Sequence, residues 1–414
     1  MSSRRRVVVW SMLSAGVLCA TSSARAQAQN AAAASPSGAE TSMTFGKGAT
    51  IRARDESASL TVRARGQFQA AYETNTAAPN TGRRPLADTD FMVRRLRLLF
   101  TGHALSKALQ YYIQLGFSYR DQEPDRLTPL RDARIMWTAH RDLSLWAGQM
   151  KVPFSRERVI SSSALQMVDR SNLNAELSLD RDVGLMITSK DFLGTRGVLR
   201  YYMGVFGGDG RNRTGDMHGL LWVARTEVNP LGNFEDYSEV DFERSTKPKL
   251  SLGVATAYNE ATARTRSTFT ESFKFGTLDY RHASADVMLK LYGASLQAEA
   301  IYRRGDKVVV GTGVENGKTV TEAPRNAWGF MLQAGVRVTS GLEAALRYSD
   351  VRPLDDSNKR MVRDREVGGA LSYYWHKHDL KLQLDYFRLL TDTDPASTAT
   401  IERDRVRVQT QVFF

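Results

Sequence analysis

Cysteine and long apolar runs are nearly absent from this chain. Its 414 residues include one cysteine, Cys19, and a quarter of them are charged; the mean hydropathy is −0.38. The longest apolar stretch, residues 7–20, is shorter than the about 20 residues that a membrane-spanning helix needs. The sequence therefore excludes a helical membrane protein.

The first 26 residues have the pattern of a secretory signal peptide. Arginines at positions 4–6 precede the apolar stretch, and Ala24-Arg25-Ala26 forms a small-x-small cleavage site, with 26–28 as a second choice. The twin arginines leave export of a folded protein as an alternative to a plain basic leader. Cleavage after Ala26 removes Cys19, which excludes disulfides, cysteine metal sites and cysteine nucleophiles from the mature chain.

Acidic residues are fewer than basic ones. The chain has 57 Lys and Arg against 45 Asp and Glu, and its formal net charge is +12. Four arginines and no acids lie in the predicted signal peptide, so the mature chain keeps a net charge of +8. The basic excess is mostly a property of the mature protein.

After an Ala/Ser/Gln-rich stretch, hydrophobic side chains recur with a period of two. We expect residues 27–58 to form a flexible periplasmic lead and residues 59–414 to form the folded part. Between positions 60 and 72, apolar and small residues alternate with Thr, Arg and Gln, which is typical of a strand with one apolar and one wet face. Later strands are predicted to start near residues 182, 197, 220, 250, 280, 295, 327, 342, 365, 380 and 401.

The predicted connections alternate between short and long. Short turns near residues 104–107, 140–142, 292–294, 339–341 and 376–379 separate long polar stretches such as 153–181 and 305–325. The polar stretch 229–249 breaks this rule, as either a long periplasmic loop or a missed hairpin. We predict an all-β fold: a transmembrane antiparallel up-and-down β-barrel of about 16 strands, with short periplasmic turns and long extracellular loops.

The last predicted strand ends on an aromatic residue. One face of this strand carries Val406, Val408, Thr410, Val412 and the terminal residue, Phe414. This ending resembles the insertion signal of outer-membrane barrels, so we expect the barrel-assembly machinery to recognise Phe414. Outer-membrane lipid would then surround the barrel.

Strand parity also predicts which side chains line the lumen. An Arg or Lys facing lipid at the membrane midplane costs about 2–4 kcal/mol, so the basic faces must point inward. The predicted inward bases are Arg63, Arg65, Arg95, Arg97, Arg134, Arg200, Arg225, Lys290, Arg303, Arg337, Arg347, Lys381, Arg403, Arg405 and Arg407. The predicted inward acids are Asp132, Glu227, Asp286, Glu299, Glu343, Glu366 and Asp385. This bias favours anions, and paired guanidiniums could pass an oxyanion along a strand; the alternative is an unselective channel with a transverse field.

One segment carries a family resemblance. Residues 148–158, Gly-Gln-Met-Lys-Val-Pro-Phe-Ser-Arg-Glu-Arg, resemble the G-Q-F-K-x-P-F-S-x-E-R pattern of the phosphate-selective porin O and P family, with Met150 in place of Phe. Asp169 replaces a Glu that is common in the family. Similar segments follow at 165–167, 169–171, 181–184, 204–210, 224–230, 292–299 and 347–349.

The resemblance implies a 16-stranded homotrimer whose third extracellular loop, here residues 152–180, folds into the lumen as a constriction. Lys151, Arg156 and Arg158 would lie at the root of that loop. The resemblance leaves open whether these side chains contact the substrate or only attach the loop to the wall.

Together these patterns predict an anion-selective porin of the Gram-negative outer membrane that passes phosphate or related oxyanions. We expect no cofactor, no metal, no enzymatic activity and no nucleic-acid partner, since Gly-x-Ser-x-Gly is absent and the bases alternate along strands. The alternatives are an unselective porin without an oxyanion site and a plugged structural or adhesive barrel.

Overall fold

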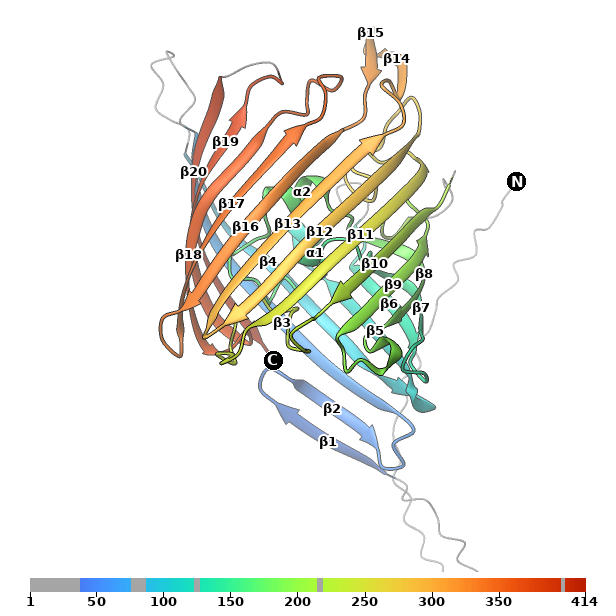
Figure 1. Cartoon of the computed structure of the whole chain (residues 1–414), viewed down its shortest axis with the longest axis vertical. Coiled ribbons are helices and arrows are strands. Elements are labelled where there is room, and N and C mark those ends of the chain that lie inside the picture. Colours follow the sequence, from blue (N-terminus) through green and yellow to red (C-terminus); the bar gives the residue numbers. More distant parts are fainter. Residues whose placement is uncertain (1–37, 76–86, 123–126, 214–218, 396–398) are drawn as a thin grey trace, which may run out of the picture.

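The computed structural model describes residues 38–75, 87–122, 127–213, 219–395 and 399–414, and they form a closed antiparallel β-barrel (Figure 1). Each strand of the barrel wall pairs with the next strand of the wall, and β20 (Thr400–Phe413) pairs with β3 (Ser59–Asn75) to close the cylinder. Among the described residues, no helix is long and apolar enough to cross a membrane. The predicted signal peptide, residues 1–26, lies outside the described residues.

Sixteen strands build the barrel wall, as the sequence pattern predicts. Besides β3 and β20 they are β4 (Ala87–Ala104), β5 (Ser106–Gly116), β6 (Leu130–Trp137), β7 (Ser144–Lys151), β8 (Arg181–Ser189), β9 (Leu199–Phe206), β10 (Leu221–Val228), β11 (Lys249–Thr262), β12 (Leu278–Leu291), β13 (Ala294–Gly305), β16 (Ala327–Arg337), β17 (Leu342–Pro353), β18 (Asp364–His376) and β19 (Leu380–Asp392).

Exposure alternates along these strands with the predicted parity. In β11, Leu252 and Val254 are exposed on the outer surface, whereas Ser251 and Ala255 are buried inside. The predicted inward acids are all buried, and most of the predicted inward bases are buried as well. The apolar residues therefore face outward and the charged ones face the interior, as expected for a wall that meets lipid.

The connections form two different rims. Short turns lie at one rim, and at the other the long loops include a small hairpin, β14 (Gly311–Glu315) with β15 (Lys318–Glu322), and the turn η1 (Tyr119–Asp121). The long turn 229–248, which lies on the short-turn rim, contains no strand, so it is a long loop and not a missed hairpin. A short helical turn, η2 (Phe192–Gly194), lies on the same rim.

A hairpin precedes the barrel, where the sequence pattern had predicted a flexible lead. Strands β1 (Ala39–Thr44) and β2 (Gly48–Ala53) pair with each other, and β2 continues the sheet along the start of β3 below the end of β20 (Figure 1). The prediction of a lead without regular structure is therefore wrong for residues 39–53. Both faces of β1 are exposed, so its sequence has no apolar alternation.

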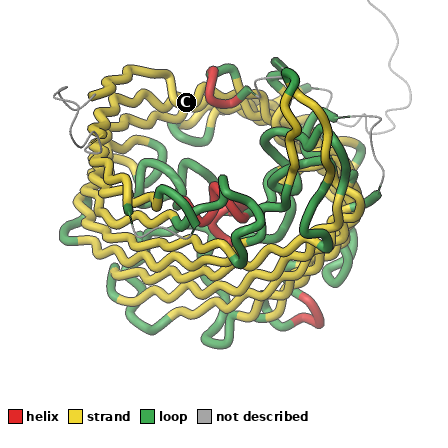
Figure 2. Tube along the Cα trace, turned by 90° about the horizontal axis from the view of Figure 1, so that it is seen from above, coloured by secondary structure: helices red, strands yellow, loops and turns green. Residues whose placement is uncertain are grey.

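The segment 152–180, between β7 and β8, folds into the barrel, and its two helices lie inside the ring of strands (Figure 2). Helix α1 (Arg156–Val159) begins where the Ser155 side chain accepts a hydrogen bond from the Arg158 backbone N–H. Helix α2 (Asn172–Leu177) begins at Ser171 in the same way and buries Leu173 and Leu177 against β13, β16 and β17. We call residues 152–180 the inner loop.

Candidate permeation pathway

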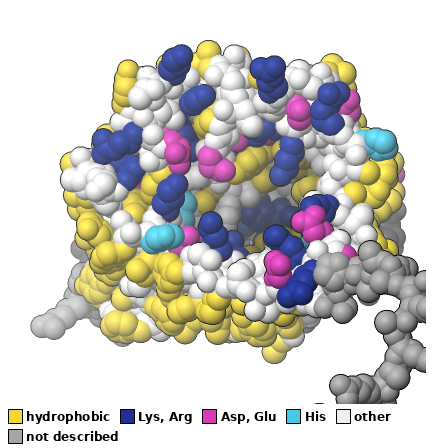
Figure 3. Space-filling view, turned by 90° about the horizontal axis from the view of Figure 1, so that it is seen from below, with side chains coloured by type: hydrophobic (Ala, Val, Ile, Leu, Met, Phe, Trp, Pro, Cys, Tyr) yellow, Lys and Arg dark blue, Asp and Glu magenta, His cyan; other side chains and the backbone are white. Residues whose placement is uncertain are grey.

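A cavity of about 1430 Å³ runs beside the inner loop along the wall formed by β4 to β9. Its lining includes Arg266 and Arg325 at the long-loop rim and Lys190 and Glu235 at the short-turn rim. Seen from the short-turn side, the molecule is hollowed, and Lys and Arg side chains surround the hollow (Figure 3). Sixteen Lys and Arg but only five Asp and Glu line the cavity.

Two β-bulges add arginines to this lining. The register between β3 and β4 shifts beside Arg95, so the extra residue Arg94 also points inward. The register between β5 and β6 shifts in the same way, and both Arg131 and Asp132 are buried. Simple parity assigns Arg94 and Arg131 to the outer face, which is why the sequence pattern missed them.

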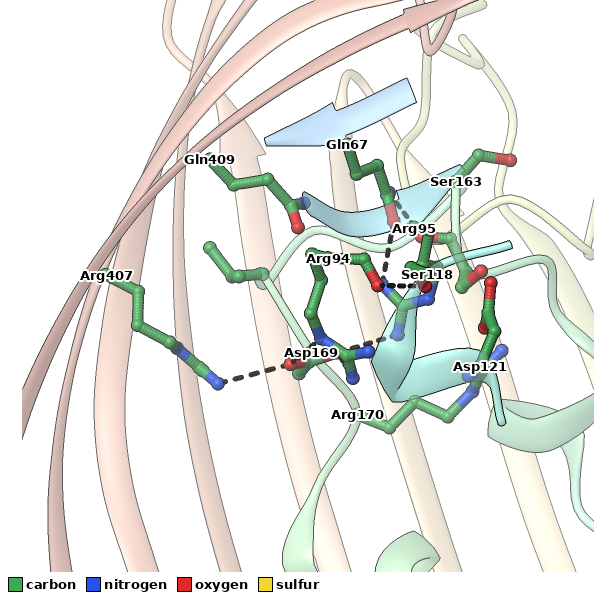
Figure 4. Close-up of polar contacts among 12 residues, drawn as sticks. Gln67, Arg94, Arg95, Ser118, Asp121, Ser163, Asp169, Arg170, Arg407 and Gln409 are labelled. Carbon is green, nitrogen blue, oxygen red and sulfur yellow. Dashed lines mark hydrogen bonds and ion pairs between the residues drawn. The ribbon is translucent and has the colours of Figure 1, made fainter. Parts of the chain in front are cut away.

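Three arginines of the wall form ion pairs with Asp169 of the inner loop (Figure 4). Arg94 donates to it through Nε and Nη2 at 3.1 and 2.9 Å, Arg95 donates at 2.8 Å, and Arg407 lies 3.5 Å away. Burial opposes ionisation here, but the three guanidiniums hold the pKa of Asp169 well below its usual range. The carboxylate therefore fixes the inner loop to β4 and β20.

Arg156 attaches the start of the inner loop to the opposite wall. Its fully buried guanidinium donates to Asp286 at 2.5 Å, to Asp236 at 3.0 Å and to Ser251 at 2.8 Å. Glu299 accepts hydrogen bonds from the backbone N–H groups of residues 156 and 157. The charges on this side of the lumen thus neutralise one another within the packed structure.

The candidate site residues are Lys151, Arg156, Arg158 and the predicted inward bases other than Lys290, Arg303, Arg337 and Arg403. Five of these fourteen line the cavity: Arg95, Arg97, Arg134, Lys151 and Arg158. Arg97 is bound by Asp121, and Arg158 lies 3.6 Å from Asp180. The other nine do not line the cavity and are held by wall, turn or inner-loop groups: Arg63, Arg65, Arg156, Arg200, Arg225, Arg347, Lys381, Arg405 and Arg407.

Lys151 and Arg170 form a cationic pair in this cavity. Lys151 Nζ donates to the Val159 and Ile160 carbonyls at 2.9 and 3.1 Å, and Arg170 donates to the same Ile160 oxygen at 2.7 Å. Within the described part of the chain, neither forms an ion pair with a carboxylate. Burial and the nearby Arg158 and Arg95 lower the pKa of Arg170 to about 9.

Besides the exposed Arg120 of η1, two further cations of the cavity have no ion-pair partner among the described residues: Arg134 of β6 and Lys190, which follows β8. The sequence pattern predicted Arg134 but missed Arg170 and Lys190. Both missed residues lie outside the strands, where no periodicity assigns a direction to a side chain.

The turn 229–248 meets the inner loop inside the barrel. Glu239, which is buried, accepts hydrogen bonds from the Gln166 backbone N–H at 2.7 Å and from the Gln333 side chain at 2.9 Å. Burial and the nearby Glu157 raise the pKa of Glu239 to about 7. This contact joins the two segments that fill the lumen beside the cavity.

The raised pKa makes the contact pH-dependent. Below about pH 4.5 Glu239 is protonated whether the turn is docked or free, whereas between pH 4.5 and 7 only the docked form keeps the proton, so docking weakens as the pH rises. Over this pH range the free energy that favours docking falls by about 3 kcal/mol. We expect single-channel current noise to increase from pH 5 to pH 8 in the wild type and to change little in Glu239→Gln. Equal pH dependence in both proteins would contradict this assignment.

Comparisons with known proteins agree with this architecture. Residues 62–414 match the family of phosphate-selective porins O and P. No curated protein sequence matches significantly.

Several solved outer-membrane channels share the fold. The anion-selective porin from Comamonas acidovorans aligns with a TM-score of 0.53 at 14% identity, covering 86% of this chain and all of that one. The DcaP channel of Acinetobacter baumannii (TM-score 0.53, 13% identity) and OmpF of Salmonella typhi in complex with daunomycin (TM-score 0.53, 14% identity) also cover 86% of this chain, over 97% and 98% of their own lengths. The chain thus belongs to the phosphate-selective porin O and P family and is an outer-membrane porin.

Proposed function

We propose that this porin passes small anions selectively, with phosphate or a related oxyanion as its substrate. The observation that carries the proposal is the pair Lys151 and Arg170, held on one carbonyl oxygen without a carboxylate partner. Because both nitrogens donate to one oxygen, at 3.1 and 2.7 Å, they lie less than about 6 Å apart. Two like charges that close in a partly hydrated site repel each other by about 1–3 kcal/mol or more. An anion between them relieves this repulsion, whereas a cation increases it.

The remaining cations give the anion a route on either side of this pair. Arg266 and Arg325, which Glu176 binds at 2.9 and 2.8 Å, lie towards the long-loop rim, and Arg134 and Lys190 lie towards the short-turn rim. Guanidinium groups bind tetrahedral oxyanions through two parallel hydrogen bonds, so they replace part of the hydration shell. Arg95, Arg97 and Arg158 take part as charges near the path, although carboxylates bind them, whereas Lys151 donates only to backbone carbonyls.

The charges around the cavity must attract the anion without trapping it. One cation about 8 Å from a monoanion contributes on the order of 1 kcal/mol at an effective dielectric near 40. About four to eight such charges give affinities between millimolar and micromolar, which suits a channel that releases its ion. No cofactor takes part in this passive process.

Phosphate titration of the chloride current tests the proposal. In planar bilayers containing the purified porin, phosphate added to KCl should reduce the chloride conductance with a half-blocking concentration in the millimolar range or below. Sulfate and phosphate compared at equal charge would rank the oxyanions. A chloride current that phosphate leaves unchanged would favour the alternative, an unselective porin, and absence of any conductance would favour a plugged barrel.

The other expected partners also remain proposals. We propose that residues 1–26 direct export, that three copies assemble, and that the terminal Phe414 is recognised during insertion. Phe414 closes the barrel through backbone hydrogen bonds with Ala64, and its side chain is exposed on the outer surface. That exposure supports recognition by another protein.

A further inference from the structure

Below the cation pair, the wall of the cavity becomes aromatic. One side chain from each of five consecutive strands lines it at the short-turn side, and we call this set the aromatic belt. The belt consists of Tyr112, Arg134, Trp146, Met186 and Tyr202. Register explains why they meet: Tyr112 of β5 is paired with Arg134 of β6, and Trp146 of β7 is paired with Met186 of β8.

Arg134 lies between two rings of the belt. Its guanidinium carbon is 4.4 Å from the centre of the Tyr112 ring and 4.7 Å from that of Trp146. Within the described residues no carboxylate pairs with it, and its Nε contacts Met136 Sδ at 3.4 Å. The two rings hold the cation in place while its terminal N–H groups remain available to a ligand.

The apolar members of the belt do not contribute to the binding of inorganic phosphate. Met186 and Tyr202 are less than a tenth exposed, and the buried indole Nε1 of Trp146 has no hydrogen-bond partner in the described structure. A small hydrated oxyanion gains nothing from such surfaces, because they cannot replace its water. The cavity is also larger than the about 300–1,000 Å³ of typical sites for organic ligands.

We propose that the aromatic belt binds organic anions with an aromatic or apolar body, such as aromatic carboxylates, as they pass through the channel. The carboxylate binds the Arg134 guanidinium, and the ring of the ligand packs against Trp146 or Tyr112. Lys190, on the short-turn side, adds a second positive charge. The inference rests on the proposed anion selectivity and names a further substrate class for the same cavity.

Block of the chloride current by benzoate, with acetate as the probe that lacks a ring, tests this inference. Benzoate should block at concentrations about 2- to 10-fold lower than acetate, because an aromatic contact contributes about 0.5–1.5 kcal/mol. Trp146→Leu should raise the ratio of the benzoate to the phosphate half-blocking concentration by about 2- to 10-fold, and Tyr112→Leu provides a second variant. Trp222→Leu, on the exposed outer face of β10, is the matched control and should not change the ratio.

The possible results separate the two proposals. Equal block by benzoate and acetate in a channel that still prefers anions would overturn the belt site and leave the proposed function intact. A ratio that changes as much in Trp222→Leu as in Trp146→Leu would also overturn it. A wild-type channel that prefers cations would overturn both proposals.

Discussion

Neutralising the cation pair, by Lys151→Gln with Arg170→Gln, will weaken phosphate block of the chloride current by about 10- to 30-fold. Each charge contributes on the order of 1 kcal/mol to the binding of an anion about 8 Å away. Because these free energies add, the loss of both charges weakens binding by a factor in this range. The pair is expected to dominate because carboxylates do not compensate it, whereas Arg97 is bound by Asp121 and Arg95 by Asp169. The measurement is a phosphate titration in planar bilayers.

A matched control removes the same number of charges elsewhere. Lys318→Gln with Lys359→Gln neutralises two exposed lysines that do not line the cavity, so phosphate block should stay at the wild-type value. Lys151→Glu alone should go further and reduce or invert the preference for anions. If the control weakens block as much as the cavity variant does, the binding energy comes from net charge and not from the pair.

Arg156→Met will release the start of the inner loop and produce a larger, noisier conductance. Removing one partner of a buried ion pair costs about 3–5 kcal/mol, because the remaining carboxylates stay buried without full compensation. Asp286 keeps Arg225 at 2.6 Å, and Asp236 keeps Arg200 at 2.9 Å, so the wall itself should survive. Single-channel recording measures the conductance, and heat-dependent migration of the folded barrel in gels verifies that the wall is intact.

Arg352→Met serves as the control for this second experiment. Arg352 pairs with Asp350 at 2.7 Å, but its own side chain is 41% exposed, and Arg363 also binds the buried Asp350, at 2.6 Å, so that carboxylate stays paired when Arg352 is replaced. We expect wild-type conductance from it. An Arg156→Met channel that matches the wild type in conductance and noise would mean that Asp169 and the buried face of α2 hold the inner loop without Arg156.

The barrel could be predicted from sequence because every strand of its wall meets the same two environments. Lipid on one side and polar groups on the other impose a period of two, so the expected starts of β16, β17 and β19 coincide with the observed ones at Ala327, Leu342 and Leu380. The hairpin at 39–53 could not be predicted in this way. Water surrounds both faces of β1, and no apolar face is required.

The site was predictable only in part, for a related reason. Parity identified Arg95, Arg97 and Arg134 as inward residues, but a single extra residue at each of two bulges turned Arg94 and Arg131 inward as well. Parity also does not reveal ion pairing. Arg407 and Arg225 point inward as predicted, yet Asp385 and Glu227 bind them, so they belong to the packed side of the lumen.

The zero-current potential of the wild-type porin across a KCl gradient tests the central claim most directly. If the cavity selects anions, chloride crosses faster than potassium, and the dilute side becomes negative relative to the concentrated side. A dilute side that becomes positive would show that potassium crosses faster and would contradict anion selectivity.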